Sequence, residues 1–319
     1  MMTISKSMIR RTRLQSSAPS FSEQTAKWLE QAQNRKRNPI RQSTAESYKS
    51  QLETNVLPVI GDLPLDAVGN TVVRELVAQM AKTLSPKTID RNINTIKDIR
   101  KSAVDQDGQP KYPYVWNAEM IDAPIVSKTT SKTPIASAQA VQDAISAAVT
   151  AGDLTTAVLI AILAGTGMRV NEALAVGAGN TLADGKIIIQ TQRGGDGPKT
   201  QAGVREVDIC SALESFIRDW YVAGSLFPMS ESYYRNKIEA YGIEGGFHTL
   251  RRFRVTHLRT EGFPEPVVHF WIGHEDKTVT DGYTIVKSEI AKRKLLAEQA
   301  GLGFKLPAII SLDKNQEKV

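Results

Sequence analysis

The sequence has 319 residues, 41% of them hydrophobic, and a formal net charge of +6, so it is long enough for two domains with cores of their own. Its one cysteine, Cys210, excludes an intramolecular disulfide and is typical of a reducing compartment. No apolar run reaches the length of a membrane span, and charges stand where a signal peptide is apolar, so we expect a cytoplasmic protein.

Basic residues are concentrated in the first fifty positions, which hold ten Lys and Arg against three acids. This balance favours a polyanion as partner. Any single one of these residues is equally well explained as an exposed surface charge, which needs no special cause. Residues 1–20 are polar, basic and Ser-rich without an apolar period, which predicts a flexible basic arm.

Residues 21–104 are predicted to form a helical domain. Apolar residues recur there at helical spacing in four stretches, which are residues 21–29, 48–57, 72–80 and 89–99. Helix-start and helix-stop residues separate these stretches, including Ser43-Thr44, Gly61-Asp62 and Ser85-Pro86. The pattern therefore predicts a bundle of four helices.

The second half of the chain is predicted to be a separate, mixed domain over residues 134–300. Residues 105–133 before it are rich in Gly, Pro, Asn and Ser and predict an interdomain linker. Within the domain, apolar helical stretches precede two β-branched runs at residues 186–191 and 204–209, which together predict a β-hairpin. Helices follow, and residues 301–319 are left as a C-terminal tail without an assigned role.

The first candidate site is a Gly-rich turn that leads into a helix at Arg169. Glu172 lies one helical turn further on, so the two side chains share a face. One interpretation is an Arg fork that binds a phosphate and is braced by the carboxylate. The alternative is an ordinary surface ion pair.

Further candidates follow in the same domain. His248 and Arg251 are spaced to lie on one face of a helix, and Gly273-His274 and then Tyr283 come after them. A His-x-x-Arg pair is common by itself, and a lone Tyr is more often a packing residue than a nucleophile. It is the ordered combination that is hard to obtain by chance.

This order of Arg169, His248-x-x-Arg251, Gly273-His274 and Tyr283 resembles the catalytic set of the tyrosine recombinases, the phage integrase family. That family also carries a Lys in a β-hairpin after the first Arg, and Lys199 stands at the matching place. Lys186 is the alternative, because the segment before Lys199 is unusually Gly-rich. The resemblance extends over residues 21–296, and departures such as Asp208-Ile209 and Ile272 touch no catalytic position.

The resemblance implies a mainly α fold. It consists of a helical, SAM-like core-binding domain and a mixed, mostly helical catalytic domain with a small antiparallel β-hairpin or sheet. A short amphipathic helix at residues 288–300 would dock on a neighbouring protomer in such a family, although packing on its own chain is equally compatible with the sequence.

The implied activity is site-specific cutting and rejoining of DNA through a 3′-phosphotyrosyl bond to Tyr283. Arg169, Arg251 and His274 would bind the phosphate oxygens, and Glu172 would support Arg169. His248 is the candidate proton acceptor for the phenol, and Lys199 is the candidate acid for the leaving 5′ hydroxyl. Because the covalent bond conserves the energy of the phosphodiester, no metal and no other cofactor is expected.

The implied partners are double-stranded DNA with specific recombination sites and a homotetramer on two such sites, with room for accessory DNA-bending proteins. The protein would then be associated with the nucleoid in the cytoplasm. We expect the DNA contacts of the first domain from Arg35, Lys36, Arg37, Arg41, Lys87 and Arg91. Two alternatives stay open, which are a type IB topoisomerase and a DNA-binding regulator without catalysis.

Overall fold

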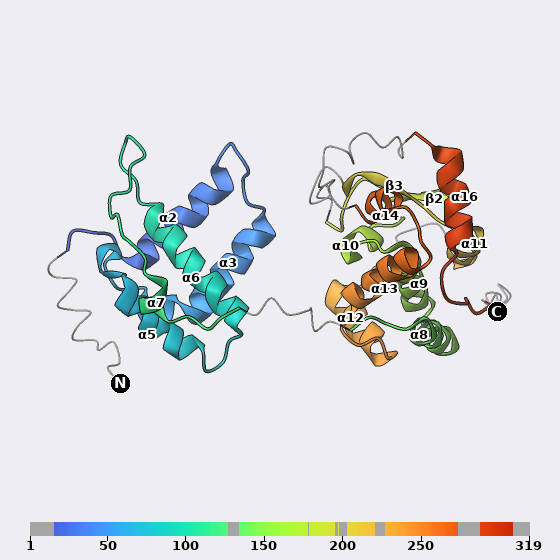
Figure 1. Cartoon of the computed structure of the whole chain (residues 1–319), viewed down its shortest axis with the longest axis horizontal. Coiled ribbons are helices and arrows are strands. Elements are labelled where there is room, and N and C mark those ends of the chain that lie inside the picture. The colour runs from blue at the N-terminus through green and yellow to red at the C-terminus, as the bar shows by residue number, and fades with distance from the viewer. Residues whose placement is uncertain are drawn as a thin grey trace, which may run out of the picture. The chain divides into compact units, whose positions relative to one another are not determined.

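The computed structural model describes residues 16–126, 134–177, 179–194, 197, 203–220, 227–273 and 288–308. The chain divides into two compact units, residues 1–129 and 130–319 (Figure 1). Each unit has its own hydrophobic core. Residues 1–15 of the predicted basic arm lie outside the described residues.

The first unit is helical. Its elements are α2 (Phe21–Asn34), α3 (Gln42–Asn55), α4 (Leu57–Ile60), the 3₁₀ helix η1 (Leu65–Ala67), α5 (Asn70–Met80), α6 (Pro86–Lys101) and α7 (Ala118–Ile121). Helix α2 begins with a capping box between Ser20 and Glu23. Helix α6 begins at Ser85, whose hydroxyl accepts a hydrogen bond from the backbone of Thr88. Their apolar faces bury one shared core.

Part of the segment expected to be a linker packs on the first unit. The hydroxyl of Tyr114 accepts a hydrogen bond from the backbone N–H of Asn70 at 2.8 Å, and Ile121 of α7 is buried in the core of this unit. The buried guanidinium of Arg100 donates to the carbonyl of Tyr112. These contacts join residues far apart in sequence, which composition does not reveal.

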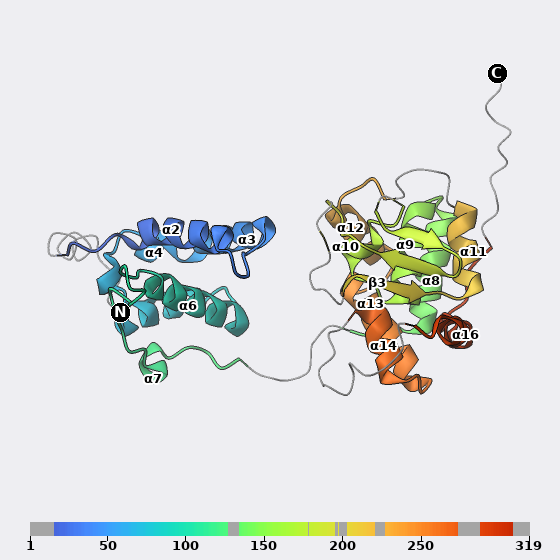
Figure 2. The ribbon, with the colours of Figure 1, turned by 90° about the horizontal axis from the view of Figure 1, so that it is seen from above.

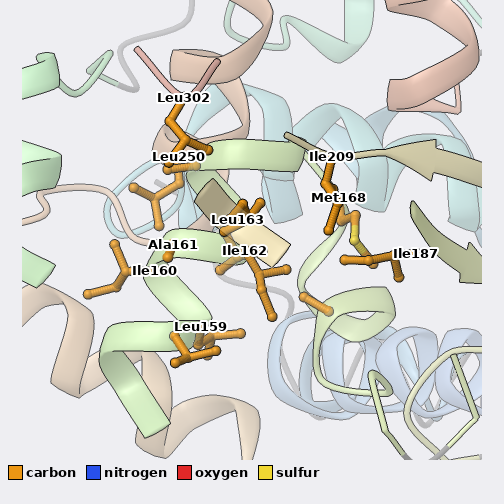
Figure 3. Close-up of a cluster of buried hydrophobic side chains, with 14 of the residues drawn as sticks. Leu159, Ile160, Ala161, Ile162, Leu163, Met168, Ile187, Ile209, Leu250 and Leu302 are labelled. Carbon is orange, nitrogen blue, oxygen red and sulfur yellow. The ribbon is translucent and has the colours of Figure 1, made fainter. Parts of the chain in front are cut away.

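The second unit is built around one buried helix, α9 (Leu154–Thr166), in which every residue from Thr156 to Thr166 is buried. A helix that is apolar all round belongs in the centre of a domain. The other helices are α8 (Ala138–Thr150), α10 (Val170–Ala173), α11 (Ser211–Trp220), α12 (Glu231–Ala240), α13 (Phe247–Thr260), α14 (Glu265–Ile272) and α16 (Ile290–Ala300). Figure 3 shows Leu159 to Leu163 of α9 within this core, with Leu250 of α13 nearby.

A small antiparallel sheet completes the second unit. Its strands are β1 (Thr181–Ala183), β2 (Lys186–Ile189) and β3 (Arg205–Asp208), in the order β1-β2-β3 (Figure 2). Lys186 lies opposite Asp208 and Ile189 opposite Arg205. The predicted hairpin is therefore present, and β1 extends it to three strands. The predicted fold class, mainly α with a small antiparallel sheet, is confirmed.

The end of the described chain also belongs to the second unit. The buried Arg254 of α13 donates to the carbonyl of Gly301 at 2.7 Å, and the imidazole of His257 lies 2.9 Å from the carbonyl of Ala300. Leu302 is buried in the core. Helix α16 thus packs on its own chain, and residues 301–308 of the predicted tail continue the fold. In the described part of the chain, every helix is too short or too polar to cross a membrane.

Candidate active site

The first candidate residue, Arg169, stands where α9 turns into α10. Helix α9 ends at Gly167, whose φ of 68° is in the left-handed region that favours glycine. Arg169 then adopts an extended backbone as the N-cap of α10. Its backbone N–H donates to Glu172 Oε2 at 3.0 Å and its Nη1 donates to Oε1 at 3.1 Å. The carboxylate therefore fixes both the backbone and the side chain of Arg169.

This pair differs from an ordinary surface ion pair in its burial. The side chain of Glu172 is completely buried, whereas that of Arg169 is 32% exposed. Burial by itself raises the pKa of Glu172, but its hydrogen bonds and charge interactions with Arg205 and Arg169 outweigh burial and hold the pKa below its usual value. Glu172 is ionised at neutral pH, and the side chain of Arg169 stays partly exposed beside it.

A second guanidinium, from Arg205 of β3, completes the environment of Glu172. Arg205 is 5% exposed. Its Nη1 lies 3.3 Å from Glu172 Oε1 and its Nη2 lies 3.0 Å from Oε2. Sequence reasoning gave this residue no role. A signal was present, because strand alternation places Arg205 on the same face as the buried Val207, and a charge there needs a buried partner.

Arg251 lies on α13 and is 7% exposed. Its Nη1 donates to the carbonyl of Gly167 at 2.7 Å, and its Nη2 donates to the carbonyl of Ile272 at 2.9 Å. Burial, together with the positive charge of Arg169, lowers its pKa to about 10. The guanidinium is therefore still charged at neutral pH.

The C-terminal end of α14 brings the three arginines together. Arg205, Arg251 and Arg169 donate to three successive carbonyls, those of Trp271 at 2.8 Å, Ile272 at 2.9 Å and Gly273 at 3.2 Å. The last carbonyls of a helix have no partner within the helix, and they carry the negative end of its dipole. Three cations, from the N-cap of α10, from β3 and from α13, can therefore gather there. We call Arg169, Arg205 and Arg251 the arginine cluster.

His248 lies on α13 one turn before Arg251, and its side chain is exposed. Partial burial and the positive charges of Arg251 and Arg252 lower the pKa of its imidazole below the usual 6.5. His248 is therefore neutral at pH 7, the form that can accept a proton. His248 and Arg251 thus lie three positions apart on one helix, as the sequence predicts.

The other three candidates, Lys199, His274 and Tyr283, lie outside the described residues. Lys186, the alternative to Lys199, has its ammonium 2.7 Å from Glu206 Oε1. In the strand register Lys186 lies opposite Asp208, which is at the other end of the β2–β3 ladder from Arg205. Within the ranges that the structure describes, no group of three His, Cys, Asp or Glu side chains is arranged to hold a metal ion.

The candidate DNA-binding residues lie at the surface of the first unit. Arg35, Lys36 and Arg37 are exposed in the connection between α2 and α3, and Arg41 is the N-cap of α3. Lys87 is exposed in the first turn of α6. Arg91 of α6 lies over the ring of Tyr48 of α3, 5.2 Å from its centroid, so the structure brings these two helices together at a basic residue.

No family model and no curated protein matches the sequence. Solved structures do match, and the Tn1549 transposon integrase in complex with transposon right end DNA aligns with a TM-score of 0.62 and 20% identity, over 87% of this chain and 99% of that one. The chain has an integrase fold. A lambda integrase tetramer bound to a Holliday junction aligns with a TM-score of 0.62 and 14% identity, over 86% of this chain and 83% of that one. The XerH site-specific recombinase bound to its difH substrate aligns with a TM-score of 0.52 and 16% identity, over 85% of this chain and 94% of that one.

Proposed function

We propose that this chain is a site-specific DNA recombinase or integrase that cuts and rejoins DNA strands through a covalent bond to Tyr283. The observation that carries the proposal is the convergence of Arg169 and Arg251 at the end of α14, directly before His274 in the sequence. Two fixed guanidiniums at one helix end suit a phosphate group. The integrase fold supports the same conclusion.

In the proposed reaction, the phenol oxygen of Tyr283 attacks the phosphorus of a DNA phosphodiester. The bond from phosphorus to the 5′ oxygen breaks and a 3′-phosphotyrosyl bond forms. Arg169, Arg251 and His274 stabilise the negative charge on the non-bridging oxygens. His248 accepts the phenol proton and Lys199 provides a proton to the leaving 5′ oxygen. Rejoining reverses these steps with the 5′ hydroxyl of another strand.

The proposed assembly is a homotetramer on two double-stranded DNA sites. The lambda integrase that aligns with this chain is a tetramer on a Holliday junction. In this proposal residues 21–104 bind core DNA, and the basic residues named above contact the DNA phosphate backbone. Residues 134–300 form the catalytic domain. Four-protomer complexes on two sites would separate a recombinase from a topoisomerase, which needs one duplex.

The nucleophile is tested by replacing Tyr283 with phenylalanine. Wild-type protein is incubated with nicked suicide substrates made from the genomic DNA that flanks its gene, and covalent complex is measured on denaturing gels. We expect Tyr283→Phe to form none. Tyr241→Phe is the matched control. The hydroxyl of Tyr241 donates to Asp153 at 3.2 Å, so this variant also loses a phenol hydroxyl, but one without a proposed part in the reaction, and it should react like wild type. Equal trapping by Tyr283→Phe and wild type would refute the proposed nucleophile.

The proposed proton acceptor predicts a pH dependence. Because the pKa of His248 lies below 6.5, its neutral form predominates at pH 7, and the protonated form gains only as the pH falls through that lowered pKa. The rate constant for covalent complex formation should therefore be level near neutral pH and decline under acidic conditions. In His248→Gln the rate should be lower and this acidic decline should vanish. An unchanged decline in that variant would assign it to another group.

A further inference from the structure

Arg205 is the least exposed member of the arginine cluster, and the reaction as proposed above does not use it. Its guanidinium is held on three sides. It donates to both oxygens of Glu172, to the carbonyl of Trp271 at 2.8 Å, and to the carbonyl of Gly203 at 3.0 Å. With its side chain only 1% exposed, it has no open surface toward a phosphate. A contact with substrate is therefore not its role.

The carboxylate of Glu172 is shared between two arginines. Oε1 accepts from Nη1 of Arg169 and from Nη1 of Arg205, while Oε2 accepts from the backbone N–H of Arg169 and from Nη2 of Arg205. Each oxygen therefore has one donor from each arginine. Such a carboxylate cannot rotate without losing hydrogen bonds in a buried environment, where an unsatisfied charge is expensive.

Arg205 also fits closely against the end of α14. Gly273 has a φ of 70°, and a Cβ at this position would lie 2.7 Å from the guanidinium carbon of Arg205. Only a residue without a side chain allows this approach. The guanidinium thus occupies the space beside Gly273, the last described residue before His274, and it fixes the end of α14.

We propose that Arg205 is a positioning residue for the reaction assigned above. It locks the Glu172 carboxylate that orients Arg169, and it holds the end of α14 from which His274 follows. This inference rests on the proposed function for its catalytic consequence, but its structural part does not. Arginine is required because its planar fork binds both carboxylate oxygens and a carbonyl at once, whereas the single ammonium of lysine cannot.

The first test measures the orientation of Arg169 without DNA. Side-chain NMR spectra of protein with ¹⁵N-labelled arginine report how freely each guanidinium rotates, and Arg169→Lys assigns the Arg169 signal. We expect a slowly rotating Arg169 guanidinium in wild type and a freely rotating one in Arg205→Lys. Arg218→Lys is the control, since Arg218 pairs with Glu214 at the surface. An Arg169 signal unchanged in Arg205→Lys would overturn the inference.

The second test measures the catalytic consequence. With saturating DNA, Arg205→Lys should lower the single-turnover rate of covalent complex formation by about 100-fold, the loss typical of misplaced catalytic groups, with the affinity for DNA changed less than about 3-fold. In a double-mutant cycle, the losses from Arg205→Lys and Glu172→Gln should combine to less than the product of the two single losses, because both changes release Arg169.

The outcomes separate the two proposals. If wild type forms no covalent complex on any DNA, the proposed function fails, and the NMR measurement still decides whether Arg205 orients Arg169. If wild type reacts and Arg205→Lys reacts at the same rate, the positioning role is wrong. If rate, DNA affinity and melting temperature all fall together and the cycle is additive, Arg205 supports only the general fold.

Discussion

Arg251→Lys is expected to lower the rate of DNA cleavage by about 1,000-fold, the upper end of the loss seen when one charge-stabilising donor is removed. The guanidinium of Arg251 binds the carbonyls of Gly167 and Ile272 through two of its nitrogens. With five N–H groups in one plane, it can keep these bonds and still donate to a phosphate. A lysine ammonium has three donors at a single point, so it must give up either the carbonyls or the phosphate.

The measurement is the single-turnover rate of covalent complex formation with saturating DNA. Arg259→Lys is the matched control, because Arg259 lies on the same helix and forms an exposed ion pair with Glu265, and its rate should stay near that of wild type. The melting temperature of Arg251→Lys should be recorded as well. If a stably folded Arg251→Lys cleaves within about tenfold of wild type, a range of about 1.4 kcal/mol in activation free energy, then Arg251 does not bind the reacting phosphate.

Glu172→Ala is expected to lower the free energy of unfolding of the second unit by about 3–5 kcal/mol, the range for breaking a buried ion pair from one side. The change leaves Arg205 buried without its carboxylate and removes a partner of Arg169. The pKa of Glu172 is lowered on folding, so its contribution to stability is full above the unfolded pKa and is lost as the pH falls through the folded one. The deficit of Glu172→Ala should therefore shrink under strongly acidic conditions.

Chemical denaturation of both proteins across this pH range tests the expectation. Glu214→Ala provides the control, because Glu214 pairs with Arg218 in a partly exposed i,i+4 arrangement that contributes less than about 1 kcal/mol. The two variants remove the same chemical group from a helix of the same unit. A deficit in Glu172→Ala no larger than that in Glu214→Ala would show that Arg205 finds other compensation.

Local patterns in the sequence predict much of this fold. The helical period of the four stretches in residues 21–104 corresponds to α2, α3, α5 and α6, and the β-branched runs correspond to β2 and β3. The pairing of Arg169 with Glu172 and the helical spacing of His248 and Arg251 also follow from residues three positions apart. These features depend on short-range geometry, which follows from the spacing of residues along the chain.

The tertiary structure decided what depends on contacts between distant residues. It placed residues 105–126 on the first unit, added β1 to the hairpin, and packed Leu302, Phe304 and Leu306 against the second core. It also brought Arg205 into contact with both oxygens of Glu172, whereas the strand pattern indicated only that Arg205 is buried.

The arginine cluster shows the physical reason. Its members bind the backbone carbonyls of Trp271, Ile272 and Gly273, and every residue has such a carbonyl, so the partner leaves no mark in the sequence. The residue types of the candidate site can therefore be predicted from the sequence. The helix end that gathers them is visible only once the chain is folded.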